Sequence, residues 1–263
     1  MSNVIYGMIA PHPPIIVPEI GGARIAQASS TRSAMEEVSK KAKSLKPDVL
    51  VIITPHGDIS ATTVHVYSGP VLEGDFSAFG DKKIKLKCKG DPVLGHKTVC
   101  EAKASGLYAA EVPESFLDHG ILVPYYSLKQ AGLNCPVLPI AVSLAPLKEL
   151  FEVGRALSKA ALSSGKKIVV VASSDMSHKL TQDAPSGYSA RGKEFDDKLV
   201  ELVKKDNRDG ILSFDPVLAE AAGQDALWSI AILLGALEGS ALKSRVLSYE
   251  GPFGVGYMVA EFI

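Results

Sequence analysis

The chain has 263 residues, of which 46% are hydrophobic and 22% are charged, and its formal net charge is -1. These values are ordinary for a globular protein that is long enough to bury a sizeable core. The near balance of 28 basic and 29 acidic residues gives no electrostatic basis for binding nucleic acid or an anionic membrane surface.

Cysteine use and hydropathy exclude further classes of protein. Cys88, Cys100 and Cys135 form no CxxC pair and are odd in number, so we expect reduced thiols in a cytoplasmic protein rather than a disulfide framework. No basic segment followed by a long apolar run opens the chain, so no secretory signal is predicted. No apolar run reaches about 18 residues, so no membrane span is predicted.

Strand-like apolar runs alternate with helical patterns along the chain. In the first half we expect strands at Val4–Ala10, Val49–Thr54, Thr62–Tyr67 and Val71–Gly74, helices at Arg24–Leu45 (with a late start near Ser29) and Asp91–Ser105, and a loop at Ser115–Gly120 that leads into a helix ending near Leu128. In the second half we expect strands at Val137–Ala141, Ile168–Ser173, Arg245–Glu250 and Gly256–Phe262, and helices at Leu147–Ser163, Tyr188–Lys205, a short stretch before Ser213, and Asp225–Leu237.

This alternation predicts an α/β fold. All-apolar strands are typical of a sheet covered on both faces, so we expect one domain over residues 1–263 with a mostly parallel central sheet and helices on both sides. Sites in open α/β sheets lie beyond the carboxyl ends of the strands. Polar residues that directly follow the apolar runs are therefore the first candidates for function.

Three histidines follow three of these apolar runs. His12 stands in Pro11-His12-Pro13-Pro14, His56 in Thr54-Pro55-His56-Gly57-Asp58, and His178 closes Ser174-Asp175-Met176-Ser177-His178. Imidazoles presented together from strand ends make part of a natural metal site.

A fourth histidine, His119, stands in the short polar loop Leu117-Asp118-His119-Gly120, and we expect it to join the same site. His65 and His96 lie within a strand-like run and an expected helix, and we interpret both as ordinary surface or core residues.

The missing element is a hard anionic ligand. Two histidines and one carboxylate on one face of an ion leave positions open for substrate and O₂, as in non-haem Fe(II) oxygenases. The candidates are Asp58, Asp175, Glu220 and Asp225. Asp225 directly precedes an apolar helix, where an acid is equally well explained as a helix cap. Nucleotide-binding glycine loops, a nucleophile elbow and an HExxH motif are absent from the sequence.

Five motifs occur in the order in which they stand in the class III extradiol ring-cleavage dioxygenases. They are Ala10-Pro11-His12-Pro13-Pro14, Pro55-His56-Gly57, Leu117-Asp118-His119-Gly120, Ser174-Asp175-Met176-Ser177-His178 and Ser248-Tyr249-Glu250-Gly251-Pro252-Phe253-Gly254. From residue 8 to the C-terminus the chain thus resembles the LigB-like catalytic subunit of protocatechuate 4,5-dioxygenase and the related Memo-like proteins. The first and last motifs are most similar to the Memo-like branch, which includes domains of the AmmeMemoRadiSam grouping.

The resemblance implies a ferrous ion held by His12, His56 and Asp225, with zinc or manganese as alternative ions. Glutamate usually stands at the position of Asp225 in the dioxygenases, and cysteine stands there in Memo-like proteins. His178 matches the acid/base histidine of the family, and His119 a second histidine near substrate and O₂. The implied reaction opens the ring of a catechol or a related small aromatic compound with O₂.

Asp175 and Asp118 are expected to orient the neighbouring imidazoles. Two other functions fit the same residues: a Memo-like non-catalytic metal-binding or scaffolding protein, and a zinc-dependent hydrolase or transferase. We expect substrate specificity to come from the loops at 59–92 and 179–192. The composition allows a homo-oligomer but does not locate an interface.

Overall fold

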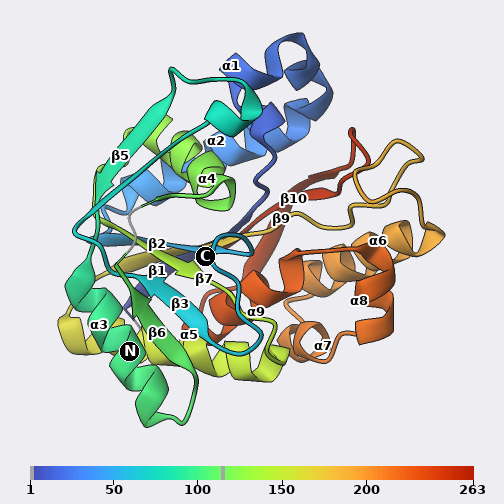
Figure 1. Cartoon of the computed structure of the whole chain (residues 1–263). Helices are drawn as coiled ribbons and strands as arrows, with labels where there is room; N and C mark the ends of the chain where they lie inside the picture. Colours follow the sequence, from blue (N-terminus) through green and yellow to red (C-terminus); the bar gives the residue numbers. More distant parts are fainter. Residues whose placement is uncertain (1–2, 114–115) are drawn as a thin grey trace.

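The computed structural model describes residues 3–113 and 116–263, so Ser115, at the start of one expected loop, lies outside the described residues. An eight-stranded sheet forms the centre of the molecule (Figure 1). In spatial order its strands are β6 (Ala109–Val112), β3 (Val64–Tyr67), β7 (Val137–Ala141), β2 (Val49–Thr54), β8 (Ile168–Ser173), β1 (Val4–Ala10), β10 (Tyr257–Phe262) and β9 (Ser244–Glu250).

The four central strands β7, β2, β8 and β1 are parallel to one another, which confirms the expected α/β architecture. β10 and β9 extend the sheet in antiparallel fashion beyond β1, and β3 is antiparallel to β7 on the other side. Every residue of β2, β7 and β8 is buried. Apart from Thr54 and Ser173 at their carboxyl ends, these strands are apolar, as is typical of strands that helices cover on both faces of a sheet.

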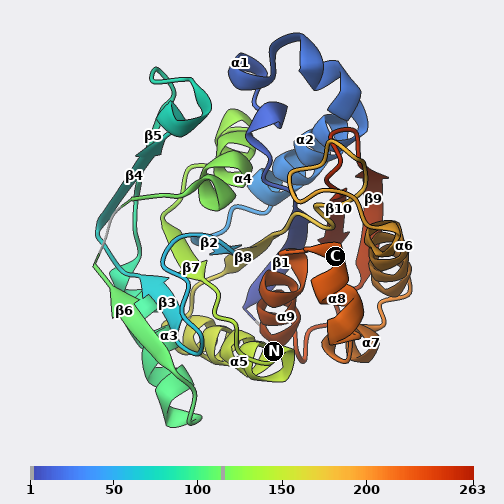
Figure 2. The same cartoon turned by 45° about the vertical axis from the view of Figure 1, so that its right-hand side comes forward.

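Helices cover the two faces of the sheet in two groups, each with its own apolar core (Figure 1). One face packs against α2 (Ser29–Ser44) and α4 (His119–Gln130). The other packs against α3 (Pro92–Ala104), α5 (Leu147–Ser164) and α9 (Ala226–Ala236). Almost all of α9 is buried, as its very apolar sequence predicts. Figure 2 shows α6 (Ala190–Lys204), α7 (Arg208–Leu212) and α8 (Pro216–Ala222) gathered beside β9 and α9.

Several elements of the structure are not apparent from the sequence patterns. β5 (Lys85–Lys89) pairs with β4 (Val71–Asp75) in a separate two-stranded sheet. Its three lysines alternate with Leu86 and Cys88, so the segment contains too few apolar residues to stand out as a strand. The four-residue β6 and the seven-residue α8 are too short to set up a clear period. As expected, α2 starts late, after a 3₁₀ segment at Gly22–Ala28; the other short helical turns are η1 (Pro14–Ile16), α1 (Pro18–Gly21) and η3 (Ser77–Phe79).

The register of the central strands sets the position of the candidate residues. Ala10, the last residue of β1, pairs with Ser173, the last residue of β8, and β2 lies on the other side of β8. The segments that carry His12, His56 and His178 therefore leave three adjacent strands at the same edge.

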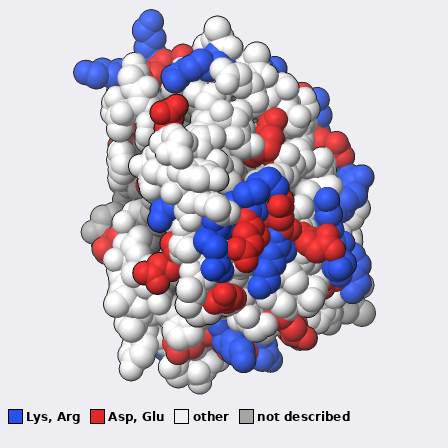
Figure 3. Space-filling view, turned by 90° about the vertical axis from the view of Figure 1, so that its right-hand side faces the viewer, with Lys and Arg blue, Asp and Glu red and all other residues white. Residues whose placement is uncertain are grey.

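Two surface properties bear on the expected partners. On the face shown in Figure 3, basic and acidic side chains are intermixed, in keeping with the near-zero net charge. Within the described part of the chain, no helix has both the length and the apolar character needed to cross a bilayer.

Candidate metal centre

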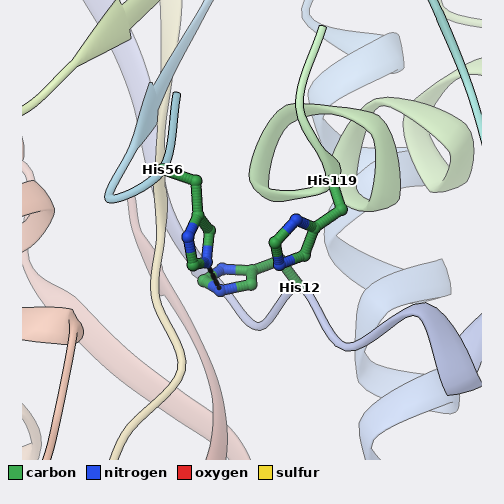
Figure 4. A group of neighbouring side chains, drawn as sticks. All are labelled: His12, His56 and His119. Atoms are coloured by element: carbon green, nitrogen blue, oxygen red, sulfur yellow. Dashed lines mark hydrogen bonds between the residues drawn. The ribbon is translucent and has the colours of Figure 1, made fainter. Parts of the chain in front are cut away.

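Three imidazoles converge at the carboxyl edge of the sheet from three separate segments (Figure 4). His12 follows β1, His56 follows β2, and His119 opens α4. The ring centroids of His56 and His119 are 4.1 Å apart, and those of His12 and His56 are 4.8 Å apart. The Nε2 atoms of His12 and His56 face each other at 3.0 Å, so both can serve one ion.

Asp225 completes this group from the start of α9. Its Oδ2 atom lies 3.5 Å from Nε2 of His12 and 3.6 Å from Nε2 of His56. Two ligand atoms that each lie about 2.1 Å from an ion, at right angles to each other, are about 3 Å apart. A small movement of Asp225 toward the two imidazoles would therefore let all three side chains bind one ion. The potential ligand atoms of His12, His56 and His119 also lie within 4.8 Å of one another, a wider spacing that fits a shared ion less closely.

Ser173, the last residue of β8, fixes the protonation pattern of the His12 ring. Its hydroxyl donates to the carbonyl oxygen of Gly120 at 2.5 Å, and it lies 2.9 Å from Nδ1 of His12. Since its only proton is engaged, the hydroxyl must accept from His12, which puts a proton on Nδ1. When the ring is neutral, the lone pair on Nε2 therefore points toward His56 and Asp225. Ser173 was not among the sequence candidates, although its polarity at the end of an all-apolar strand is a signal.

Asp175 forms hydrogen bonds with two of the candidate ligands, His12 and Asp225. Its Oδ1 atom accepts a hydrogen bond from the backbone N–H of His12 at 2.9 Å, and its own N–H donates to Oδ1 of Asp225 at 2.9 Å. Asp175 is buried, and its Oδ2 atom lies 3.8 Å from Nε2 of His12. Asp175 therefore links the backbone of His12 to the side chain of Asp225, and its expected role in orienting the imidazoles stays a prediction.

His178 presents one ring nitrogen to the same centre. Its Nδ1 atom lies 2.9 Å from the carbonyl oxygen of Gly223 and 3.1 Å from that of Met176. Carbonyl oxygens only accept hydrogen bonds, so Nδ1 carries a proton. Nε2 lies 4.0 Å from Oδ2 of Asp225, beside the triangle formed with His12 and His56.

Asp118 reaches the centre indirectly. Its Oδ1 atom accepts a hydrogen bond from the Thr54 hydroxyl at 2.9 Å, and the same hydroxyl accepts from the backbone N–H of His56 at 3.1 Å. The structure thus connects Asp118 to the turn that carries His56. Phe79, which was not singled out from the sequence, packs on His119 with ring centroids 5.2 Å apart.

Burial and neighbouring charges divide the imidazoles into one basic and two weakly basic groups. Although burial opposes its charge, the carboxylates of Asp175 and Asp225 raise the pKa of His12 to about 9. Burial, reinforced by the charge on His12, lowers the pKa of His56 to about 4. Burial and the charges on His56 and His12 lower the pKa of His119 to about 3. Between about pH 4 and pH 9, the metal-free centre therefore favours a charged His12 with a proton on both ring nitrogens, next to neutral His56 and His119.

The two histidines interpreted as ordinary, and the carboxylate candidates Asp58 and Glu220, have their contacts elsewhere. His65 bonds through Nδ1 to the carbonyl oxygen of Asp58 at 2.7 Å, and the Asp58 side chain pairs with the same ring at 3.2 Å. His96 pairs with Glu111 at 2.8 Å on the surface. Glu220 is exposed. Of the four carboxylate candidates, Asp225 is the one whose oxygen faces both His12 and His56.

A parallel sheet whose strand ends bring imidazoles and a carboxylate to one point is typical of metal-dependent enzymes. Comparison with known families defines the class further. Residues 6–260 match the model of the catalytic LigB subunit of aromatic ring-opening dioxygenase, and the chain belongs to this family. The resemblance to the LigB-like dioxygenase subunit is thereby confirmed, and the closer similarity to the Memo-like branch stays a prediction.

Individual relatives are more distant. Protein CA_C1420 of Clostridium acetobutylicum is 31% identical over 96% of this chain, which spans 56% of the length of that relative. The 2-aminophenol 1,6-dioxygenase beta subunit of a Pseudomonas species is 24% identical over 99% of this chain and 94% of its own length. The crystal structure of the uncharacterized protein JW3007 from Escherichia coli K12 covers 98% of this chain and 99% of that chain, with a TM-score of 0.65 and 15% identity, and supports the fold.

Proposed function

We propose that the chain is a non-haem Fe(II)-dependent extradiol-type dioxygenase that opens the ring of a catechol or a related small aromatic compound with O₂. The observation that carries this proposal is the convergence of Nε2 of His12, Nε2 of His56 and Oδ2 of Asp225 within 3.0 to 3.6 Å. Such a set of two histidines and one carboxylate leaves positions on the ion open for substrate and O₂. When bound, ferrous iron would supply the redox chemistry that the protein side chains lack.

His178 is the proposed proton acceptor. Its Nδ1–H is held by two carbonyl oxygens, so the lone pair on Nε2 is directed to the side where Asp225 lies. A base in this position can take the proton of a substrate hydroxyl, a type of catalysis typically worth about 10²- to 10⁴-fold in rate. The proton would return through the same atom when the ring opens.

His119 is the proposed stabiliser of developing negative charge. The low pKa of its ring, about 3, keeps it neutral at ordinary pH. A neutral imidazole can donate one N–H without adding a full charge beside His12 and His56. A fixed donor of this kind stabilises charge that forms only during the reaction.

The relative named 2-aminophenol 1,6-dioxygenase beta subunit supports a substrate with two adjacent polar groups on an aromatic ring. The direct test is anaerobic loading of the protein with Fe(II), followed by exposure to O₂ and a panel of catechols and 2-aminophenols. We expect stoichiometric O₂ uptake and a coloured ring-opened product with at least one compound. Full iron occupancy without O₂ uptake on the whole panel would instead favour the non-catalytic, Memo-like alternative.

A zinc-dependent hydrolase or transferase is the second candidate, because a specific observation favours it. His12, His56 and His119 form a three-imidazole group, and three histidines with an open fourth position are a known catalytic zinc arrangement. Elemental analysis of protein purified without added metal distinguishes the two candidates. Iron or an empty centre that accepts Fe(II) supports the oxygenase, whereas stoichiometric zinc that Fe(II) cannot displace supports the hydrolase.

A further inference from the structure

Asp196 is a buried carboxylate that the proposed reaction does not use. It lies in the middle of α6 with no exposed surface. Its Oδ1 atom accepts a hydrogen bond from the backbone N–H of Ser177 at 2.9 Å, and its Oδ2 atom accepts from the hydroxyl of Tyr249 at 2.7 Å. Within the described ranges, no lysine, arginine or histidine forms an ion pair with it. An apolar residue would be the less costly occupant of such a position, so the carboxylate calls for a specific explanation.

The backbone that Asp196 holds belongs to the segment Ser174–His178. This segment makes three connections to the candidate metal centre: the N–H of Asp175 donates to Asp225, Oδ1 of Asp175 accepts from His12, and His178 itself faces Asp225. Ser177 lies between Asp175 and His178. A shift of its peptide group would therefore change the position of His178 and of the carboxylate of Asp225 together.

The turn between β9 and β10 holds the same segment from the other side. The N–H of Met176 donates to the carbonyl oxygen of Gly256 at 2.8 Å, and the N–H of Gly256 donates to that of Ser177 at 2.9 Å. The packing is so close that a Cβ atom on Gly256 would overlap Oδ2 of Asp196. Asp196 thus lies at the junction of α6, the β9–β10 turn and the segment that carries His178.

Tyr249 and Gly251 to Gly254 belong to the last of the five sequence motifs, which the metal centre leaves without a role. Tyr249 is half-buried on β9, and its hydroxyl is directed at Asp196. The adjacent Glu250 accepts a hydrogen bond from the N–H of Thr31 in the first turn of α2 at 2.7 Å. The motif therefore joins β9 to two helices, and one of these links leads to His178 through Asp196 and Ser177.

We propose that Asp196 and Tyr249 are a pair of positioning residues for the reaction. Tyr249 fixes the rotamer of Asp196, and Asp196 fixes the Ser177 peptide, so that Nε2 of His178 is held facing Asp225. The inference rests on the proposed function for its kinetic consequence. Its structural part, the orientation of the His178 ring, is independent of turnover.

The chain offers a matched control for the removal of the Tyr249 hydroxyl. Tyr6 also donates from a buried hydroxyl to a buried carboxylate, Oε2 of Glu261, at 2.6 Å. Glu261 lies on β10, where it also accepts from Arg245 at 2.8 Å. Tyr249→Phe and Tyr6→Phe each delete one tyrosine–carboxylate hydrogen bond, but only Tyr249→Phe acts on the segment that carries His178.

The experiment compares Tyr249→Phe, Tyr6→Phe, Asp196→Ala and Asp196→Asn with the unchanged protein. Steady-state kinetics on the iron-loaded protein give kcat and KM, and ¹⁵N chemical shifts of the His178 ring in zinc-loaded protein report which ring nitrogen carries the proton. We expect Tyr249→Phe and Asp196→Ala to lower kcat about 10- to 100-fold, with KM changed less than about threefold, as is typical for partners that orient functional groups. The same two variants should lose the purely Nδ1-protonated form of His178.

Asn at position 196 keeps an oxygen that can accept from the N–H of Ser177, so Asp196→Asn should retain most of the kcat that Asp196→Ala loses. Tyr6→Phe should leave both kcat and the His178 spectrum unchanged. If Asp196→Ala does not fold, Tyr249→Phe decides. The proposal is overturned if Tyr249→Phe matches Tyr6→Phe in both kcat and the ¹⁵N shifts of His178, or if Asp196→Asn is as damaging as Asp196→Ala. If the unchanged protein opens no ring, the proposed function fails, and the ¹⁵N spectra alone still decide the positioning role.

Discussion

Metal binding at His12, His56 and Asp225 should depend steeply on pH, because a proton has to leave His12 before its Nε2 atom can bind an ion. Asp175 and Asp225 overcome the effect of burial and raise the pKa of His12 to about 9, whereas that of His56 is about 4. Between these values, one proton is displaced per ion bound at the three ligands.

The size of the effect follows from the pKa of His12. One displaced proton changes the apparent Kd about tenfold for each pH unit, so binding at pH 8 should be about 100-fold tighter than at pH 6. Asp225→Asn removes a ligand and one of the two carboxylates that raise the pKa of His12. This variant should bind the ion at least about 100-fold more weakly and show a shallower dependence on pH.

The assay is a competition titration of Zn²⁺ against a chelator of known proton affinity, from pH 6 to pH 8. A slope of one decade per pH unit, after correction for the chelator, is the expected result. A flat profile would refute the reasoning, because it would mean that Nε2 of His12 carries no proton in the metal-free protein. An unchanged Kd in Asp225→Asn would remove Asp225 from the ligand set.

Four further outcomes follow from the structure. His178→Gln should lower kcat about 10²- to 10⁴-fold while metal content, measured by elemental analysis, stays at one ion per chain. His65→Gln, made in a histidine that pairs with Asp58 away from the centre, should leave kcat within about twofold. The metal-free protein should lose about 3 kcal/mol of its free energy of unfolding between about pH 6.5 and pH 9. The raised pKa of His12 stabilises the folded state fully below about pH 6.5, and this stabilisation is lost as the pH rises through about 9. Urea unfolding at several pH values measures the change. Gly256→Ala should cost about 1 to 3 kcal/mol in the same assay, because the added methyl group overlaps Oδ2 of Asp196.

Much of the site could be predicted from local patterns, because parallel strands place their carboxyl ends at one edge. The apolar runs before His12, His56 and His178 correspond to three adjacent strands, and the structure brings all three rings to one place. His119 joins them, although the residues alone show only that it stands in a polar loop. The choice of Asp225 among four carboxylates came from the family resemblance, since its residue type and place suit a helix cap equally well.

The groups that orient the site could not be found in this way. Ser173 acts through a carbonyl 53 residues away, and Tyr249 reaches Asp196 across 53 residues. The spacing of apolar residues along the sequence does not predict such contacts, because they depend on how helices and turns pack against the sheet. For the same reason the sequence does not predict β5, β6 and α8, because each is short or strongly charged and is stabilised by its neighbours rather than by its own pattern. The expected cytoplasmic location and the oligomeric state stay predictions.

The most direct test of the proposed metal centre is a crystal structure of the protein loaded anaerobically with Fe(II). We predict one ion bound within about 2.0 to 2.2 Å by Nε2 of His12, Nε2 of His56 and an oxygen of Asp225, with His178 and His119 nearby but unbound. An ion held by His12, His56 and His119 with Asp225 turned away, or an ion bound elsewhere, would contradict this prediction.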